Sequence, residues 1–111
     1  MRKSFFSILL TFFLSMTTSH ALAYDIAVPN ADGVTIYYNF INDETELSVT
    51  NGESGVLYTG NVVIPDEVTI DNKWKVTSIG YSAFKNCRGL TSVTIPNSVT
   101  SIESSSFQYC I

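Results

Sequence analysis

The chain has 111 residues, 45% of them hydrophobic, with 6 basic and 10 acidic side chains and a formal net charge of −4. This length allows one small domain, and the acidic balance excludes phosphate backbones and anionic lipid surfaces as natural partners. The single histidine, His20, lies in the N-terminal segment. The rest of the chain therefore has no Ser-His or Cys-His nucleophile, and most zinc sites are excluded as well.

Residues 1–23 are predicted to be a cleavable signal peptide. Arg2 and Lys3 precede an apolar run over residues 5–16, and a small-residue site follows at 21–23, which is the order of segments in secretory signals. An uncleaved membrane anchor is the alternative, but the run is shorter than the about 20 residues that span a bilayer. We expect the mature protein to begin at Tyr24, to be secreted or held at the bacterial cell surface, and to have no membrane contact. Without the 23 residues and their two basic side chains, it would have 88 residues and a net charge of −6.

Residues 24–61 contain no repeat and are predicted to form a β cap. Residues 34–41 are rich in β-branched and aromatic side chains, residues 42–44 are typical of a turn, and residues 46–50 alternate polar and apolar side chains. This pattern predicts a β-hairpin. A non-repetitive β segment ahead of a repeat is typical of a cap, which covers the core that the end repeat would otherwise expose.

A repeat of period 23 occupies residues 62–111. Seven of twelve positions are identical between 76–87 and 99–110, a period within the range of about 20–29 residues for leucine-rich repeats. In each repeat we expect a strand, as at 90–95, then a turn, a second short strand and a helical turn, since Phe107 and Cys110 are three residues apart. Phe84 and Phe107, which share a repeat position, are predicted to stack in the core.

The first repeat carries eight additional residues. Two alternating stretches around a polar turn at 71–73 predict a protruding hairpin over residues 68–76. Trp74 and Tyr81 are expected to cover the core, with a position at the end of the repeat array as the alternative. Cys87 and Cys110 also share a repeat position. A stacked pair of core thiols is favoured over a disulfide, which export would permit.

These residues resemble the BspA-type leucine-rich repeat, which is common in secreted and surface proteins of oral and gut bacteria. The resemblance covers residues 62–111, and residues 58–65 are similar to the lead-in found before such repeats. It implies a mainly β fold, with about two coils of a right-handed solenoid behind the hairpin cap. It also implies adhesion to, or binding of, a protein ligand such as a host extracellular or matrix protein.

Two departures from the pattern make the last repeat more polar, because Glu103 stands at the position of Gly80 and Ser106 at that of Ala83. The chain also stops two residues before Leu90 would recur. The sequence therefore predicts a truncated array with an open C-terminal coil that is prone to self-association.

No catalytic, cofactor-binding or metal-binding residue is predicted, no cofactor is expected, and no particular binding residue stands out. The acidic runs at 43–46 and 66–67 are interpreted as solvated turns, since neither has the pattern of a calcium loop. Serines 104–106 have no partner base in a recognisable motif. We expect a non-enzymatic binding or adhesion module that uses the exposed strand faces and the hairpin at 68–76. The alternative is a structural N-terminal fragment of a longer repeat protein, without activity of its own.

Overall fold

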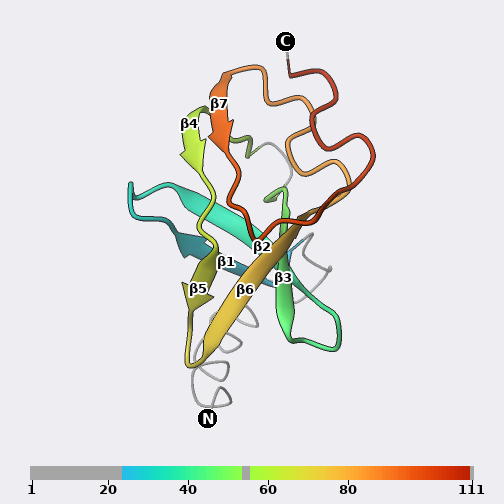
Figure 1. Ribbon diagram of the computed structural model, residues 1–111. Helices are drawn as coiled ribbons and strands as arrows, with labels where there is room; N and C mark the ends of the chain where they lie inside the picture. Colours follow the sequence, from blue (N-terminus) through green and yellow to red (C-terminus); the bar gives the residue numbers. More distant parts are fainter. Residues whose placement is uncertain (1–23, 54–55, 111) are drawn as a thin grey trace, which may run out of the picture.

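A computed structural model describes residues 24–53 and 56–110, so the predicted signal peptide and its cleavage site lie outside the described residues. The described part is mainly β, as predicted, and contains eight strands and no α-helix. The strands (Figure 1) are β1 (Ile26–Pro29), β2 (Thr35–Ile41), β3 (Glu46–Thr50), β4 (Gly60–Val63), β5 (Glu67–Thr69), β6 (Lys73–Ile79), β7 (Leu90–Thr94) and β8 (Ser101–Ile102). Within these ranges, no helix has the length and apolar character needed to cross a membrane.

The first three strands form an antiparallel meander. β2 pairs with β1 on one side and with β3 on the other, which confirms the hairpin predicted over residues 34–50. The turn between β2 and β3 places Asn42, Asp43 and Glu44 at φ values of 53°, 57° and 62°. Asn and Asp tolerate this left-handed region better than most residues do. The meander ends with β3, whose free edge receives the repeat region.

Parallel pairing joins β3 to the first repeat and the first repeat to the second. β3 pairs with β6 so that Val49 is opposite Ile79, and β6 pairs with β8 so that Ile79 is opposite Ile102. β5 and β6 pair antiparallel, which confirms the hairpin predicted over residues 68–76. A separate two-stranded sheet pairs β4 with β7 in parallel, with Val62 opposite Val93. These parallel pairs bring the two copies of the repeat into contact along their length.

The predicted helical turns are wrong. Residues 81–86 and 104–109 form successive tight turns that include residues with positive φ. These residues are Ser82 (58°), Asn86 (65°), Ser105 (62°) and Tyr109 (62°). A residue with left-handed φ interrupts an α-helix, and a tight turn can place side chains three positions apart on one face just as a helix does. The spacing of Phe107 and Cys110 therefore did not distinguish the two conformations.

The backbone of these turns bonds both within its own segment and to the neighbouring repeat, since the amides of Ala83 and Lys85 donate to the carbonyls of Gly80 and Ser82. The amides of Ser82, Phe84 and Asn86 donate to carbonyls of the next copy, at 3.4, 2.7 and 2.9 Å. The acceptors are the carbonyls of Ser104, Ser106 and Gln108. Alternate N–H groups thus point along the direction in which the repeats stack, an arrangement that an α-helix, which bonds within its own segment, does not provide.

An aromatic column runs through the core. Phe84 and Phe107 stack with ring centroids 5.1 Å apart and planes 1° from parallel, which confirms the predicted stack. Tyr58 continues the column on the other side of Phe84, at 4.7 Å. Its hydroxyl donates to the Thr50 carbonyl at 2.6 Å and accepts from the Tyr37 amide at 3.0 Å. Burial raises the pKa of Tyr58, so the phenol stays protonated and the column remains uncharged.

Trp74 and Tyr81 have different environments. Trp74 is 3% exposed and packs against Phe40 with centroids 4.8 Å apart, as expected for a residue that covers the core. The expectation for Tyr81 is wrong, since its side chain is 67% exposed. Tyr81 follows Gly80 at the end of β6, where the chain has already left the sheet, and it is available for contact with a ligand.

Candidate functional site

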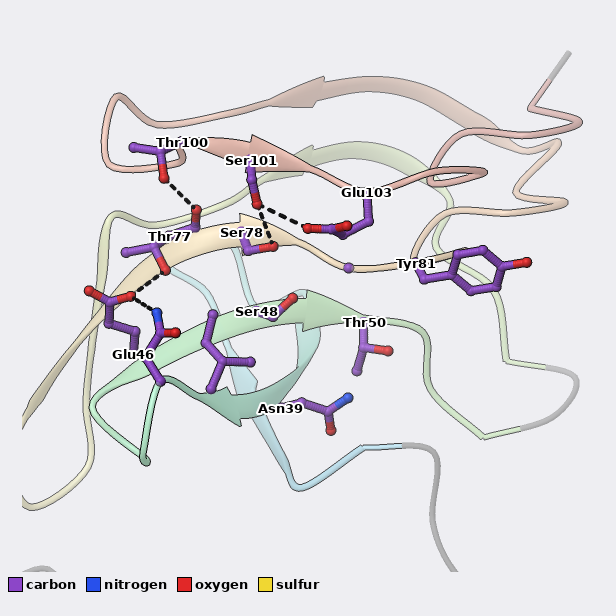
Figure 2. Close-up of a pocket in the computed structure, with 13 residues that line it drawn as sticks. Asn39, Glu46, Ser48, Thr50, Thr77, Ser78, Tyr81, Thr100, Ser101 and Glu103 are labelled. Atoms are coloured by element: carbon purple, nitrogen blue, oxygen red, sulfur yellow. Dashed lines mark hydrogen bonds between the residues drawn. The ribbon is translucent and has the colours of Figure 1, made fainter.

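A polar groove of about 560 Å³ lies on the face of the sheet formed by β2, β3, β6 and β8 (Figure 2). Its lining combines hydroxyl, amide and carboxylate side chains with one aromatic ring. The lining residues are Asn39, Ile41, Asn42, Glu46, Ser48, Thr50, Thr77, Ser78, Gly80, Tyr81, Thr100, Ser101 and Glu103. Because the opposite face of these strands packs into the core, the groove is the side that the strands present to solvent.

A ladder of serine hydroxyls forms the middle of the groove. The register places Ser48 of β3 opposite Ser78 of β6, and Ser78 opposite Ser101 of β8. The Ser78 and Ser101 hydroxyls are 3.2 Å apart. A shift in register between Leu47 and Ser48 brings Ser48 opposite Ser78, so this irregularity of the ladder aligns the three serines.

Glu46 lies at one end of the groove and is held by neutral donors. Its Oε1 accepts hydrogen bonds from the Asn42 amide and, at 3.0 Å, from the Thr77 hydroxyl. Lys75 is its register partner across β3 and β6 but does not line the groove. The interpretation of residues 43–46 as one solvated turn is therefore wrong for Glu46, which belongs to β3; Asp43 and Glu44 do lie in the exposed turn.

Glu103 is the second carboxylate of the groove. Its Oε2 is 3.2 Å from the Ser101 hydroxyl, and its amide donates to the Ile79 carbonyl at 2.9 Å. An ionised carboxylate only accepts hydrogen bonds, so Ser101 donates its proton to Glu103 and Ser78 donates to Ser101. No lysine or arginine is among the described residues that line the groove, so the charge of Glu103 has no cationic partner there.

Gly80 keeps the floor of the groove open. A Cβ at this position would lie 2.9 Å from the Val49 carbonyl oxygen and 3.0 Å from the Ser48 hydroxyl, because the Gly80 amide bonds to Val49 O at 2.7 Å. Glu103 has the same repeat position, but it lies over β6 and has room for a long side chain. The second repeat can therefore have Glu103 in place of glycine, because its neighbour is β6 and not β3.

The other departure also has a physical explanation. Ser106 is 3% exposed, and its hydroxyl donates to the Gly80 carbonyl at 3.0 Å and also contacts the Glu103 carbonyl. A buried hydroxyl that is hydrogen-bonded costs little, so serine replaces alanine here without a loss of packing. Ser106 therefore has a structural role.

The two cysteines are free thiols, Cys87 buried and Cys110 half-buried. Desolvation by burial, and to a lesser extent the nearby Cys110, raises the pKa of the Cys87 thiol. The Cys110 thiol donates to the Phe84 carbonyl at 2.8 Å. A protonated thiol in an apolar environment is a poor nucleophile, so Cys87 acts as a packing group, and Cys110 packs against the same core. Among the described residues, no three histidine, cysteine or acidic side chains lie close enough together to hold a metal ion.

Exposed strand faces are predicted from the sequence as a binding surface, but none of the residues that line the groove is. A signal was present, because the pair Thr77-Ser78 recurs as Thr100-Ser101 at the repeat spacing. Apolar positions that recur indicate the core, whereas polar positions that recur on a strand indicate a surface shared by neighbouring repeats. The contribution of Ser48 had no such signal, because β3 lies outside the repeat.

Comparisons with known proteins agree with this fold. Residues 61–111 match the family described as the BspA type leucine rich repeat region. Three solved structures are similar to this chain, and each similarity covers 78% of it. The first is a leucine-rich repeat protein from Bacteroides ovatus, with 34% identity and a TM-score of 0.64. The others are a leucine-rich repeat protein from Bacteroides capillosus and a leucine rich cell surface protein from Faecalibacterium prausnitzii, both 27% identical, with TM-scores of 0.59 and 0.57.

The parallel strands one repeat apart, the period and these likenesses identify a leucine-rich repeat protein. More specifically, the matched part of the chain, residues 61–111, belongs to the BspA-type leucine-rich repeat family. The chain spans 21%, 60% and 21% of the lengths of the three similar structures. No curated protein matches it.

Proposed function

We propose that this chain is an exported, non-catalytic module that binds a protein ligand at the bacterial surface through the groove on β3, β6 and β8. The observation that carries the proposal is the groove itself, where three parallel strands present a continuous polar surface next to the exposed ring of Tyr81. Export rests on the predicted signal peptide and is supported by the likeness to a leucine rich cell surface protein. The ligand class, a host extracellular or matrix protein, comes from the family.

The same proposal includes the architecture around the groove. The two repeats are the first coils of a right-handed solenoid, and β1 to β3 are its cap. The parallel pairing of β3 with β6 supports this, because β3 occupies the position that a preceding repeat would have. Tyr58 supports it as well, since its ring continues the column of Phe84 and Phe107.

The test measures binding of the exported protein to immobilised extracellular matrix proteins. Collagen and laminin serve as ligands and serum albumin as the control. We expect saturable binding to a matrix protein that decreases when Ser78 and Ser101, in the middle of the groove, are both replaced by lysine. Binding to none of the matrix proteins, or binding that this double variant leaves unchanged, would argue against the proposal.

A second candidate is a structural role at the N-terminal end of a longer repeat array. It is favoured by the lengths of the similar structures, of which two are covered only to 21%. The second repeat has exposed apolar side chains, with Ile102 at 53% and Ile95 at 36%, that a further coil would cover. We expect residues 24–111 alone to self-associate through this surface, and Ile102→Lys to weaken the association in sedimentation experiments. A wild-type segment that stays monomeric at high concentration would contradict this role.

A further inference from the structure

We propose that the groove recognises a cationic side chain of the partner, an arginine guanidinium or a lysine ammonium, at a subsite formed by Glu103, Ser48 and Tyr81. This inference rests on the proposed function, because it specifies which part of a protein ligand the groove would take. It concerns the end of the groove at Tyr81 (Figure 2), where residues of the first repeat, the second repeat and β3 line the same groove.

Charge is the first argument. The lining contains two carboxylates, Glu46 and Glu103, and no lysine or arginine among the described residues. Glu46 already accepts two side-chain hydrogen bonds, from Asn42 and Thr77, whereas Glu103 has only the Ser101 hydroxyl as a side-chain partner. An anionic ligand would meet uncompensated negative charge, while a cation would find its complement at Glu103.

Hydrogen-bonding capacity is the second argument. The donors next to the carboxylates are already used, since Thr77 donates to Glu46 and Ser101 donates to Glu103. What remains at the surface is mostly lone pairs on carboxylate and hydroxyl oxygens. A ligand that fits this surface brings several donors and no acceptor, and guanidinium and ammonium groups are the protein side chains with that property.

Ser48 is an independent indication of a ligand. Its side chain is 7% exposed and lines the groove, and its hydroxyl takes no part in the side-chain hydrogen bonds of Glu46, Ser78 and Glu103 there. The Gly80 position leaves its hydroxyl accessible, because a Cβ there would lie only 3.0 Å from it. The accessible Ser48 oxygen can accept a hydrogen bond, and a bound cation brings the donor.

Tyr81 completes the subsite. Its side chain is 67% exposed, and it follows Gly80, whose repeat equivalent is Glu103. In Figure 2 the ring lies at the same end of the groove as Glu103, away from Glu46. A cation within about 6 Å of an aromatic face is attracted by the ring, so a guanidinium held by Glu103 can also stack on Tyr81.

The test titrates the exported protein with a hexa-arginine peptide and follows backbone NMR signals. We expect shifts at residues 80–81 and 101–103. We expect Glu103→Gln to weaken binding by about three- to fivefold, as for an exposed ion pair, and Tyr81→Leu by about two- to threefold. The effect of Glu46→Gln should be smaller than that of Glu103→Gln, because Glu46 lies at the other end of the groove and already accepts hydrogen bonds from Asn42 and Thr77. Added salt should weaken wild-type binding, since an exposed charge pair is screened.

The matched control is Asp32→Asn. It removes the same charge from an exposed turn outside the groove and should leave binding unchanged. The subsite is refuted if Glu103→Gln binds the peptide as the wild type does, or if maltohexaose or hexa-glutamate binds as tightly as hexa-arginine. Unchanged NMR signals away from the substituted positions show that each variant is folded.

The outcomes separate this inference from the proposed function. Matrix-protein binding that Glu103→Gln does not weaken would overturn the cation subsite and leave the binding module intact. Specific hexa-arginine binding without any matrix-protein binding would support the subsite and overturn the matrix ligand.

Discussion

Two copies of one twelve-residue pattern, residues 76–87 and 99–110, have very different environments in the same molecule. In the first copy, Ile79, Phe84 and Cys87 are no more than 1% exposed. In the second, Ile102 is 53% exposed, and Phe107 and Cys110 are half-buried. The first copy lies between β3 and the second copy, whereas the second has a neighbour on one side among the described residues. Burial in a stacked array is thus determined by neighbours, and an identical residue contributes differently to stability in each copy.

The largest expected difference is between the two phenylalanines. Phe84→Ala removes a ring that is packed on both sides, by Tyr58 and Phe107, and should lower the free energy of unfolding by about 3–5 kcal/mol. Phe107→Ala should cost less than half as much, because its ring is half-buried. Chemical denaturation of both variants measures the two losses in free energy of unfolding. Equal losses would show that the two phenylalanines contribute equally, which would contradict the comparison.

The next largest difference in stability is expected between substitutions at Gly80 and at Glu103, its equivalent in the second repeat. Gly80→Ala places a Cβ 2.9 Å from the Val49 carbonyl oxygen, and we expect overpacking to cost about 1–3 kcal/mol. Glu103→Ala, at the same repeat position, should change stability by less than about 0.5 kcal/mol, as is usual for exposed sites. Thermal unfolding of the two variants is the measurement. A Gly80→Ala variant as stable as the wild type would show that β3 and β6 separate without cost.

Ser106 and Ala83 share a repeat position, and substitutions there should change the free energy of unfolding by a smaller amount. Ser106→Ala removes the hydroxyl that bonds to the Gly80 carbonyl at 3.0 Å and should cost about 1 kcal/mol. Ala83→Gly, a control at the equivalent position, removes a buried methyl group without touching a hydrogen bond. Unfolding curves compare them, and a stabilised Ser106→Ala variant would show that the hydroxyl is not needed.

The smallest effect concerns the thiols and is read from reactivity. Burial raises the pKa of Cys87, so at a given pH less of it is thiolate than in an unfolded chain. The protonated form is favoured by folding, so the contribution of this group to stability is lost as pH rises through the raised pKa. We expect alkylation to modify the half-buried Cys110 first, and Cys87 only at higher pH or on unfolding. Mass spectrometry of partly alkylated protein gives the order, and faster modification of Cys87 would refute it.

Sequence predicted the features that depend on local patterns. The hairpin of β2 and β3 and the stack of Phe84 on Phe107 followed from alternation and from the period of 23. The conformation of the turns could not be predicted in this way, because helices and tight turns both place side chains three positions apart on one face. The groove could not be predicted either, since it depends on the register between β3 and β6, which no repeated residue encodes. The role of Tyr58 depends on contacts with Tyr37 and Thr50, which lie outside the repeat.

The pairing offsets between strands have a consequence for the length of the chain. Val62 pairs with Val93, 31 positions away, whereas Ile79 pairs with Ile102, 23 positions away. The eight additional residues protrude from the stacked repeats as the β5–β6 hairpin. The strands before and after them therefore keep their partners, β4 with β7 and β6 with β8. One residue added within 80–83 would instead displace Phe84 from the aromatic column. The tip of the hairpin, at Asp71 and Asn72, is therefore the place where an epitope or a fluorescent reporter can be inserted while the stacking of the repeats is preserved.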